Sequence, residues 1–405
     1  MKIWIKYLIA AILGVAFGLF VPIPGAVLDT FATVAVNILR VILVPLLLFS
    51  VPVAVHELHG ERKLLRTILR CSLYSLIAIF LMTIIGATGA ILFADSRIPL
   101  SNESGSLINL PSWHDLLVTG FPANLLAAFS GSEYLLPVLI LGIVLGLAFS
   151  TDKNAVKPVL QLTDALSRLV WHINSFIVEI FPLPLIALSA ARIATLRGTI
   201  DFSKFARLFQ LLGIETGLII VILLPLVLFL GGRRTPPLRV LYALIAPAIV
   251  AIFSANAYAP ASVLSRHLKE SLGVRRRVGS ISLPLTMLLG RPGTALVAAS
   301  SFIVILNSYS TLGLGPRAFF YLALFVPLST LLVAAAPALG PAACIAFLSQ
   351  HYGKGFESGY LLILPIALPL QALGVFLDSL IHGAIVYLTA NAEHETTHKD
   401  TRHFI

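Results

Sequence analysis

Charged residues are scarce in this chain. They make up 11% of its 405 residues, whereas hydrophobic residues make up 58%. Soluble globular proteins carry about 25% charged residues, so this composition excludes an ordinary soluble domain. Apolar runs of roughly 18 residues or more recur, and each can cross the ~30 Å hydrocarbon core of a bilayer. The sequence predicts a polytopic all-α membrane protein, since a β-barrel would show short alternating segments instead.

Cysteine is almost absent, and so are the common catalytic motifs. Cys71 and Cys344 lie far apart in apolar segments, which argues against a disulfide framework or a metal site. The chain has no H-E-x-x-H or G-x-S-x-G motif. We therefore expect neither an enzyme nor a cofactor. The net charge of +10 is typical of membrane proteins with basic cytoplasmic loops, so we expect no nucleic-acid partner.

Six apolar segments in the first part of the chain are predicted to span the membrane: 3–21, 32–55, 68–94, 135–149, 166–190 and 211–230. The basic loops between them are predicted to face the cytoplasm: 56–66, 231–239 and 265–277. The polar stretch 95–115 is predicted outside, and 150–157 inside. No clear cleavage site follows the first segment, so we expect a multi-pass protein of a prokaryotic inner membrane with both termini in the cytoplasm.

One loop departs from this charge pattern, because the topology places it outside although it is basic. Its cations are Arg192, Arg197, Lys204 and Arg207.

The second half contains apolar segments that are interrupted twice in the same way. Segments 244–264 and 324–348 each carry prolines around a centre of small residues. Pro284 follows Pro247 by 37 residues, and Pro365 follows Pro327 by 38 residues, each in a longer apolar segment. This internal repeat, with a period of about 80 residues, predicts a re-entrant hairpin followed by an interrupted helix in each half. Such repeated interruptions indicate the binding site of a transporter.

Irregular backbone at membrane depth must face protein or a water-filled cavity, because its polar groups cannot remain bare in lipid. Two hairpin tips and two broken helices are therefore expected to meet at one cavity. The N-terminal ends of half-helices offer free N–H groups to an anion.

Three stretches resemble the dicarboxylate/amino acid:cation symporter family, which includes the glutamate transporters. "NILRVILVPLLLFSVPV" (37–53) resembles its second helix, and "LLPVLILGIVLGLAF" (135–149) resembles its fourth. "VGSISLPLTMLLGRPGTALV" (278–297) resembles its seventh, whose pattern is F-x-L-P-L-G-A-T-x-N-M-D-G-T. The similarity covers nearly the whole chain.

The resemblance implies eight transmembrane helices plus two re-entrant hairpins, assembled as a homotrimer with an elevator mechanism. A trimerisation scaffold would hold helices 1–2 (1–66) and the outer loop with helix 4 (95–165). A sliding transport domain would hold helix 3 (67–94), hairpin 1 with helix 7 (241–308) and hairpin 2 with helix 8 (309–390). Helices 5–6 would occupy 166–240, and 391–405 would be a cytoplasmic tail.

The chain departs from the family at its sodium sites. The family's N-M-D-G-T reads here Gly290-Arg291-Pro292-Gly293-Thr294, so a cation stands where Asn and Asp help bind sodium. In the last helix, the family's Asn and Asp of a sodium site correspond to Asp378 and His382. In the third helix, the family's Tyr/Thr/Ser cluster for a further sodium corresponds to Ser75, Ala78 and Ile79. The predicted cation-site replacements are Gly290, Arg291, Pro292, Asp378 and His382.

The substrate site is rewritten as well. Gln371 stands where the family has the Asp for a substrate amine, and Gly374 where it has the Arg for a side-chain carboxylate. The predicted substrate-binding residues are Ser254, Asn256, Tyr258, Arg291, Thr294, Ala336, Gln371, Gly374 and Asp378.

Arg291 has two functional interpretations beside a plain structural contact. Its guanidinium can take the space of a sodium ion, or it can bind a substrate carboxylate bidentately. Asp378 and His382 lie four residues apart, on one helical face. They can form a local hydrogen-bonded pair, or Asp378 can form an ion pair with Arg291. The functional alternative is a proton relay through the two side chains. Glu179, His172 and Glu215 lie in or near scaffold segments, and we treat them as structural residues that are candidates for pairing with Arg40.

The sequence therefore predicts a secondary active or facilitative transporter of a small organic anion or amino acid, without sodium coupling. A sodium- or proton-coupled symporter is one alternative. An anion channel or a non-transporting receptor on the same fold is another.

Overall fold

The structure is a computed structural model, and it describes residues 2–21, 24–93, 98, 110, 112–124, 129, 134–151, 156–199, 202–232, 236–309, 316–353 and 355–405. Most of the predicted outer stretch 95–115 lies outside these ranges, as do 152–155 and 233–235 of two predicted inner loops. Within them the chain is helical, and its one β-bridge joins Val274 to Thr396.

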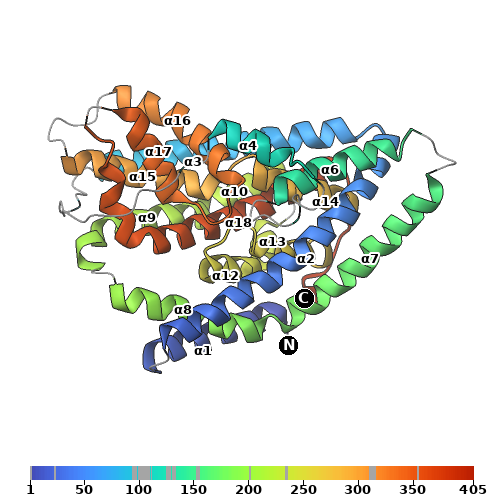
Figure 1. The fold of residues 1–405 in the computed structure, drawn as a ribbon, viewed down its shortest axis with the longest axis horizontal. Helices are drawn as coiled ribbons and strands as arrows, with labels where there is room; N and C mark the ends of the chain where they lie inside the picture. Colours follow the sequence, from blue (N-terminus) through green and yellow to red (C-terminus); the bar gives the residue numbers. More distant parts are fainter. Residues whose placement is uncertain are drawn as a thin grey trace.

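The helices pack in two groups that lie against each other (Figure 1). The first group comprises α1 (Ile3–Phe20), α2 (Gly25–Gly60), α6 (Leu135–Ala148), α7 (Lys157–Ile180) and α8 (Pro182–Thr199), with the short α4 (Trp113–Gly120) beside α6. Of these, α1 and α8 lie at the bottom of the view, and α6 and α4 in its upper part. The second group comprises α3 (Leu64–Leu92), α12 (Ile245–Ser254), α13 (Pro260–Glu270), α14 (Arg276–Leu288), α15 (Pro292–Tyr309), α16 (Pro316–Ala334), α17 (Pro341–Tyr352), η3 (Gly359–Ile366) and α18 (Ala367–Ala392).

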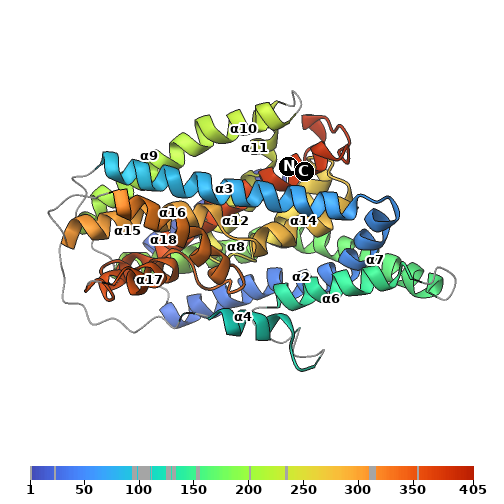
Figure 2. The same cartoon turned by 90° about the horizontal axis from the view of Figure 1, so that it is seen from above.

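A further run of helices lies along one edge of the second group (Figure 2). It comprises η1 (Phe202–Phe205), α9 (Ala206–Leu218), the π-helix η2 (Ile219–Leu223), α10 (Leu224–Gly231) and α11 (Pro237–Ala243). Large apolar side chains of this run are exposed, among them Val221 and Leu230. Exposed apolar faces of this kind suit contact with lipid rather than with water.

Six described helices are long and apolar enough to cross a membrane, or up to eight if each bent pair is counted as one span. The chain is therefore a multi-pass membrane protein. The predicted segment 166–190 is not one straight span, because α7 and α8 meet at an angle of 55°. Pro182 and Pro184 explain the bend, since proline removes a helical N–H donor and its ring clashes with the preceding turn.

Both predicted hairpins are present as helix–break–helix units. The first consists of α12 and α13, separated by a tip at 255–259, where Ala255 has the left-handed φ of 45°. The second consists of α16 and α17, separated by a tip at 335–340. The helix after the first hairpin is broken between α14 and α15, as predicted, at Gly290 with φ of 127°.

The second interrupted helix is a prediction that the structure corrects. Pro365 lies in the 3-10 helix η3, and α18 then runs unbroken from Ala367 to Ala392. Proline is tolerated there because it precedes the first turn of the α-helix, where its missing N–H costs nothing.

The C-terminal segment 393–405 is docked against the rest of the protein. The Glu395 carboxylate is buried and accepts from Lys63 Nζ at 3.1 Å and Arg277 Nη2 at 2.6 Å. The Thr397 N–H donates to Gly273 O at 2.8 Å. Phe404 is buried and stacks on Tyr242 with ring centroids 6.0 Å apart. The two chain ends consequently lie close together (Figure 1).

Glu395→Gln is expected to release this segment. Burial alone would raise the pKa of Glu395, but hydrogen bonds from Arg277 and Lys63 outweigh burial and hold it below its ordinary value of 4.5. The stabilisation is therefore present above about pH 4.5 and is lost as the pH falls through the lower, folded pKa. Removing one partner of a buried ion pair lowers the free energy of unfolding by about 3–5 kcal/mol. The loss is smaller here, because the Lys63 side chain is one-third exposed and water can solvate its charge.

Hydrogen exchange of residues 393–405, followed by mass spectrometry, checks this expectation. The wild type should stay protected at pH 7 and lose protection only in acid, whereas Glu395→Gln should exchange fast at both pH values. Glu357→Gln, at an exposed turn, is the matched control. Equal protection of the wild type and Glu395→Gln at pH 7 would contradict it.

Candidate functional site

Where helices of the second group are interrupted, charged side chains form hydrogen bonds with backbone carbonyl and N–H groups. The Arg291 guanidinium is 1% exposed and donates to carbonyls of the second hairpin tip. Its Nη2 lies 2.8 Å from Ala336 O and 3.5 Å from Ala334 O, and its Nη1 bonds to Leu339 O. Because α16 ends at Ala334, this cation sits at the negative end of the helix dipole.

Asp378 lies at the N-terminal end of α15, where the helix dipole is positive. Its Oδ1 accepts from Gly293 N at 2.6 Å and Thr294 N at 3.3 Å, and its Oδ2 accepts from Thr294 Oγ1 at 2.8 Å. These N–H groups are the free donors of the first turn of α15, where the dipole favours an anion. The carboxylate thus caps the second half of the broken helix.

His382 forms a hydrogen bond with the backbone carbonyl of Gly290, at the break between α14 and α15. Its Nε2 lies 3.2 Å from Gly290 O, so this nitrogen carries the hydrogen and donates. Neither Arg291 nor His382 forms a hydrogen bond or ion pair with Asp378, although all three are buried in one region. The local Asp378–His382 pair and the Asp378–Arg291 ion pair are therefore both wrong for this conformation.

Two polar side chains tie the hairpin tips together. Tyr258, fully buried in the first tip, donates to Ala335 O at 2.7 Å in the second tip. Gln371 Nε2 lies 3.2 Å from both Ala255 O and Leu339 O, one carbonyl from each tip. A Cβ on Gly340 would lie 1.4 Å from Gln371 Oε1, so glycine is needed there for this approach.

A cavity of about 680 Å³ lies between the first helix group and the two hairpin tips. Of the predicted substrate-binding residues, Ser254, Asn256 and Gln371 line it. The others lie outside its lining: Tyr258, Arg291, Thr294, Ala336, Gly374 and Asp378. Gly374 is packed against Thr294 and Pro341, and a Cβ on it would lie 3.1 Å from Thr294 Oγ1.

Pro292 needs no separate ligand role, because it begins α15, where its missing N–H would be a free donor in any case. Gly290 permits the positive φ at the break, and a Cβ on it would lie 2.5 Å from the Ile79 side chain.

Arg192 is a residue of this region that the sequence did not single out as a site residue. From α8 it donates through Nε to Phe253 O at 3.1 Å and through Nη2 to Ser254 O at 3.0 Å, and so caps the C-terminal end of α12. It also lines the cavity with Arg40 and Asp29. Its departure from the positive-inside pattern was the signal that could have identified it.

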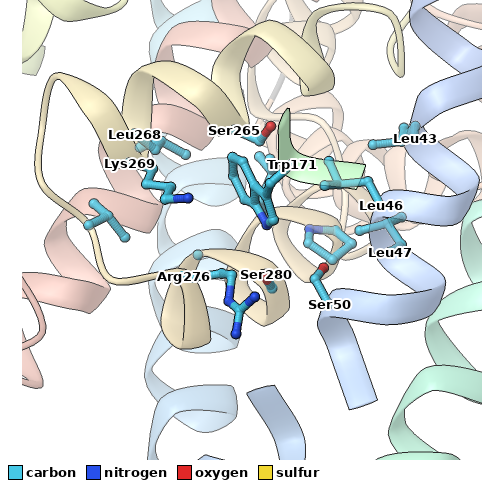
Figure 3. A pocket seen from close by; sticks show the side chains of 14 residues that line it. Leu43, Leu46, Leu47, Ser50, Trp171, Ser265, Leu268, Lys269, Arg276 and Ser280 are labelled. Carbon is cyan, nitrogen blue, oxygen red and sulfur yellow. The ribbon is translucent and has the colours of Figure 1, made fainter. Parts of the chain in front are cut away.

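A second, much smaller cavity of about 20 Å³ lies where α2 and α7 meet α13 and α14 (Figure 3). Leu43, Leu46 and Leu47 line one side, and Lys269 Nζ lies 4.4 Å from the centroid of the Trp171 ring. It has room for about one water molecule, so it cannot hold a substrate. This apolar contact is an interface between the two helix groups.

Comparison with known proteins identifies the family. A sequence profile described as "Sodium:dicarboxylate symporter family" matches residues 3–390. The chain belongs to this family. The family resemblance that the sequence suggested is confirmed.

Several relatives carry transporter names. A C4-dicarboxylate transport protein of Rhodospirillum rubrum is 25% identical over 243 residues, which are 57% of this chain and 53% of the relative. A C4-dicarboxylate transport protein of Anaeromyxobacter sp. is 21% identical over 320 residues, 76% of this chain and 72% of the relative. A serine/threonine transporter of Acinetobacter baumannii is 26% identical over 371 residues, 89% of this chain and 84% of the relative. The chain thus spans about half the length of the first of these symporter-family relatives.

Proposed function

We propose that this chain is a secondary transporter of a small organic anion or amino acid that works without sodium. The observation that carries the proposal is the contact of the Arg291 guanidinium with Ala334 O, Ala336 O and Leu339 O. In transporters with broken helices, unwound carbonyls and C-terminal helix ends coordinate the coupling cation. A guanidinium that occupies such carbonyls would take the place of that ion.

A fixed side chain cannot serve as a coupling ion. The guanidinium stays protonated under all physiological conditions and is covalently attached, so it is neither bound nor released in a transport cycle. Arg291 would hold the second hairpin tip closed in the way a bound cation would, but independently of any ion gradient.

The cavity supports a carboxylate-bearing substrate. Its lining contains Arg40 and Arg192 against one acid, Asp29, together with the hydroxyl of Ser254 and the amide of Gln371. Its volume is within the range of about 300–1,000 Å³ that is usual for small-molecule sites. Relatives named for C4-dicarboxylates and for serine and threonine make these compounds the first probes.

The elevator mechanism and the homotrimer are parts of the same proposal. The second helix group would move against the first, across the apolar interface between α2 and α14. Arg192, which reaches from α8 to the first hairpin tip, would then release Ser254 O in each cycle.

Sodium independence is the test of this proposal. We expect succinate or L-serine to raise the melting temperature of the purified protein equally in sodium and in choline buffer, because a ligand that binds only the folded state stabilises it by mass action. Counterflow of the same compound in proteoliposomes should likewise be equal in both buffers. Stabilisation or exchange that requires sodium would show that a cation site survives beside Arg291.

A further inference from the structure

Glu215 is a buried acid that the site above does not use. It lies in α9, 4% exposed, and its Oε2 lies at the hydrogen-bond distance of 2.7 Å from Ser300 Oγ in α15. Its Oε1 has no hydrogen-bond partner among the residues that the structure describes and faces α3, where a Cβ on Gly89 would lie 2.2 Å away. The predicted pairing with Arg40 is wrong: the Arg40 guanidinium lies 5.6 Å from the centroid of the Tyr134 ring.

No cation compensates this carboxyl among the described residues. Helices α3 and α15, the 3-10 helix η1 and the π-helix η2 pack against α9. The charged or titratable residues of these elements and of α9 itself are Arg66, Arg70, Cys71, Tyr74, Lys204, Arg207 and Tyr309. Tyr74 is roughly 22 Å along α3 from Gly89, and Arg207 roughly 12 Å along α9 from Glu215.

An ionised carboxylate in this place would be a bare charge in an apolar interior. Such a charge is expensive at membrane depth, and the group takes up a proton instead. In the conformation described here, Glu215 is therefore a neutral acid that holds one proton.

Ser300 lets the acid exist in both protonation states. Its Oγ lies 2.7 Å from Glu215 Oε2 and 3.0 Å from Leu296 O, but its one hydrogen can be donated to only one of them. When Glu215 is neutral, its own O–H donates to Ser300 Oγ, and Ser300 donates to Leu296 O. When Glu215 loses the proton, a rotation of the Ser300 hydroxyl supplies the hydrogen bond to the carboxylate.

The helix that carries Glu215 runs directly into a π-turn. The π-helix η2 begins at Ile219, directly after α9, and π-turns often mark functional sites. Within the part of the chain that the structure describes, nothing lies within 4 Å of a Cβ placed on Gly213 or Gly217, two residues before and after Glu215. Moving the extra residue of the π-turn through α9 would rotate Glu215 by about 100° and take it away from Gly89 and Ser300.

We propose that Glu215 is a proton-binding site of this transporter, so that a proton takes the coupling role that sodium has elsewhere in the family. The inference rests on the proposed sodium-free transport. The chemistry is a reversible proton transfer: the Glu215 O–H bond breaks to give a carboxylate, and the proton goes to water on the side to which the shifted helix exposes the group.

The transport test uses proteoliposomes in choline buffer, with radiolabelled succinate and L-serine as probes. The wild type should accumulate its substrate when the outside is more acidic, and a gradient of one pH unit can sustain about a tenfold ratio at one proton per substrate. Glu215→Gln should retain counterflow but lose this accumulation. Glu357→Gln, at an exposed turn, should behave like the wild type. Equal pH-driven accumulation by Glu215→Gln and wild type would overturn the proposal.

Infrared difference spectroscopy tests the proton site without any substrate. The protonated carboxyl of Glu215 should give a C=O band at about pH 6 that disappears reversibly in alkaline buffer. Glu215→Gln should lack the band, and Ser300→Ala should shift its frequency, because the hydrogen bond to the carboxyl is removed. A wild-type spectrum without a titrating band assigned to Glu215 would overturn the inference. A titrating band in a protein that exchanges neither probe would support the proton site and contradict the proposed function.

Discussion

Arg291→Met is expected to destabilise the protein by about 3–5 kcal/mol and to abolish sodium-free uptake. Methionine has a similar reach but no donors, so Ala334 O, Ala336 O and Leu339 O lose the guanidinium. A buried acceptor without a partner costs about 1–3 kcal/mol. Removing one charge from a buried region that also holds Asp378 adds to this cost. Chemical unfolding in mixed micelles measures the change in stability.

The same variant should gain a requirement for a cation. Without the guanidinium, three carbonyls and a buried carboxylate remain in one region, and oxygen ligands of this kind suit a small hard cation. Sodium or lithium should therefore restore part of the lost stability, whereas choline should not. Arg207→Met is the matched control, because Arg207 is exposed on α9 and makes no contact with the site. Unchanged stability and uptake in Arg291→Met would rule out the ion-replacing role.

The sequence predicts the interruptions of the helices better than their contacts. Prolines and small residues around 247–260 and 327–341 mark the two hairpins, because proline removes backbone donors and small residues allow close approach. A permanent charge at membrane depth marks Arg291 as a residue with a required partner. Which carbonyls receive it could not be predicted, because they lie more than 40 residues away and depend on how α16 ends.

Other features depend on packing that single-sequence patterns do not contain. The sequence places Glu215 in the scaffold because its segment is simply apolar, yet α9 packs on α3 and α15. Pro365 suggests a broken helix, but the chain enters α18 only two residues later. Arg192 looks like an exception to a topology rule, and it is instead a cap for the end of α12. In each case the sequence identifies the residue but does not predict which part of the fold it contacts.

Asp378→Ala is expected to cost about 3–5 kcal/mol, the second largest effect. It removes the acceptor for Gly293 N, Thr294 N and Thr294 Oγ1 at the start of α15, and it leaves Arg291 as an uncompensated buried charge. Asp378→Asn keeps one acceptor oxygen and should cost less, about 1–3 kcal/mol. Unfolding midpoints of both variants, with Thr389→Ser as a conservative change in the same helix, measure the difference.

A double-mutant cycle then separates capping from charge balance. Arg291 and Asp378 do not touch, but each lies at a helix end whose dipole favours its own sign, and together they leave the region neutral. If this balance matters, Arg291→Met combined with Asp378→Asn should be less destabilised than the sum of the single changes by about 1 kcal/mol or more. Strict additivity would mean that each side chain acts only on its own backbone partners. In that case Arg291 would fasten the second hairpin tip without serving as the electrostatic counterpart that a bound cation would provide.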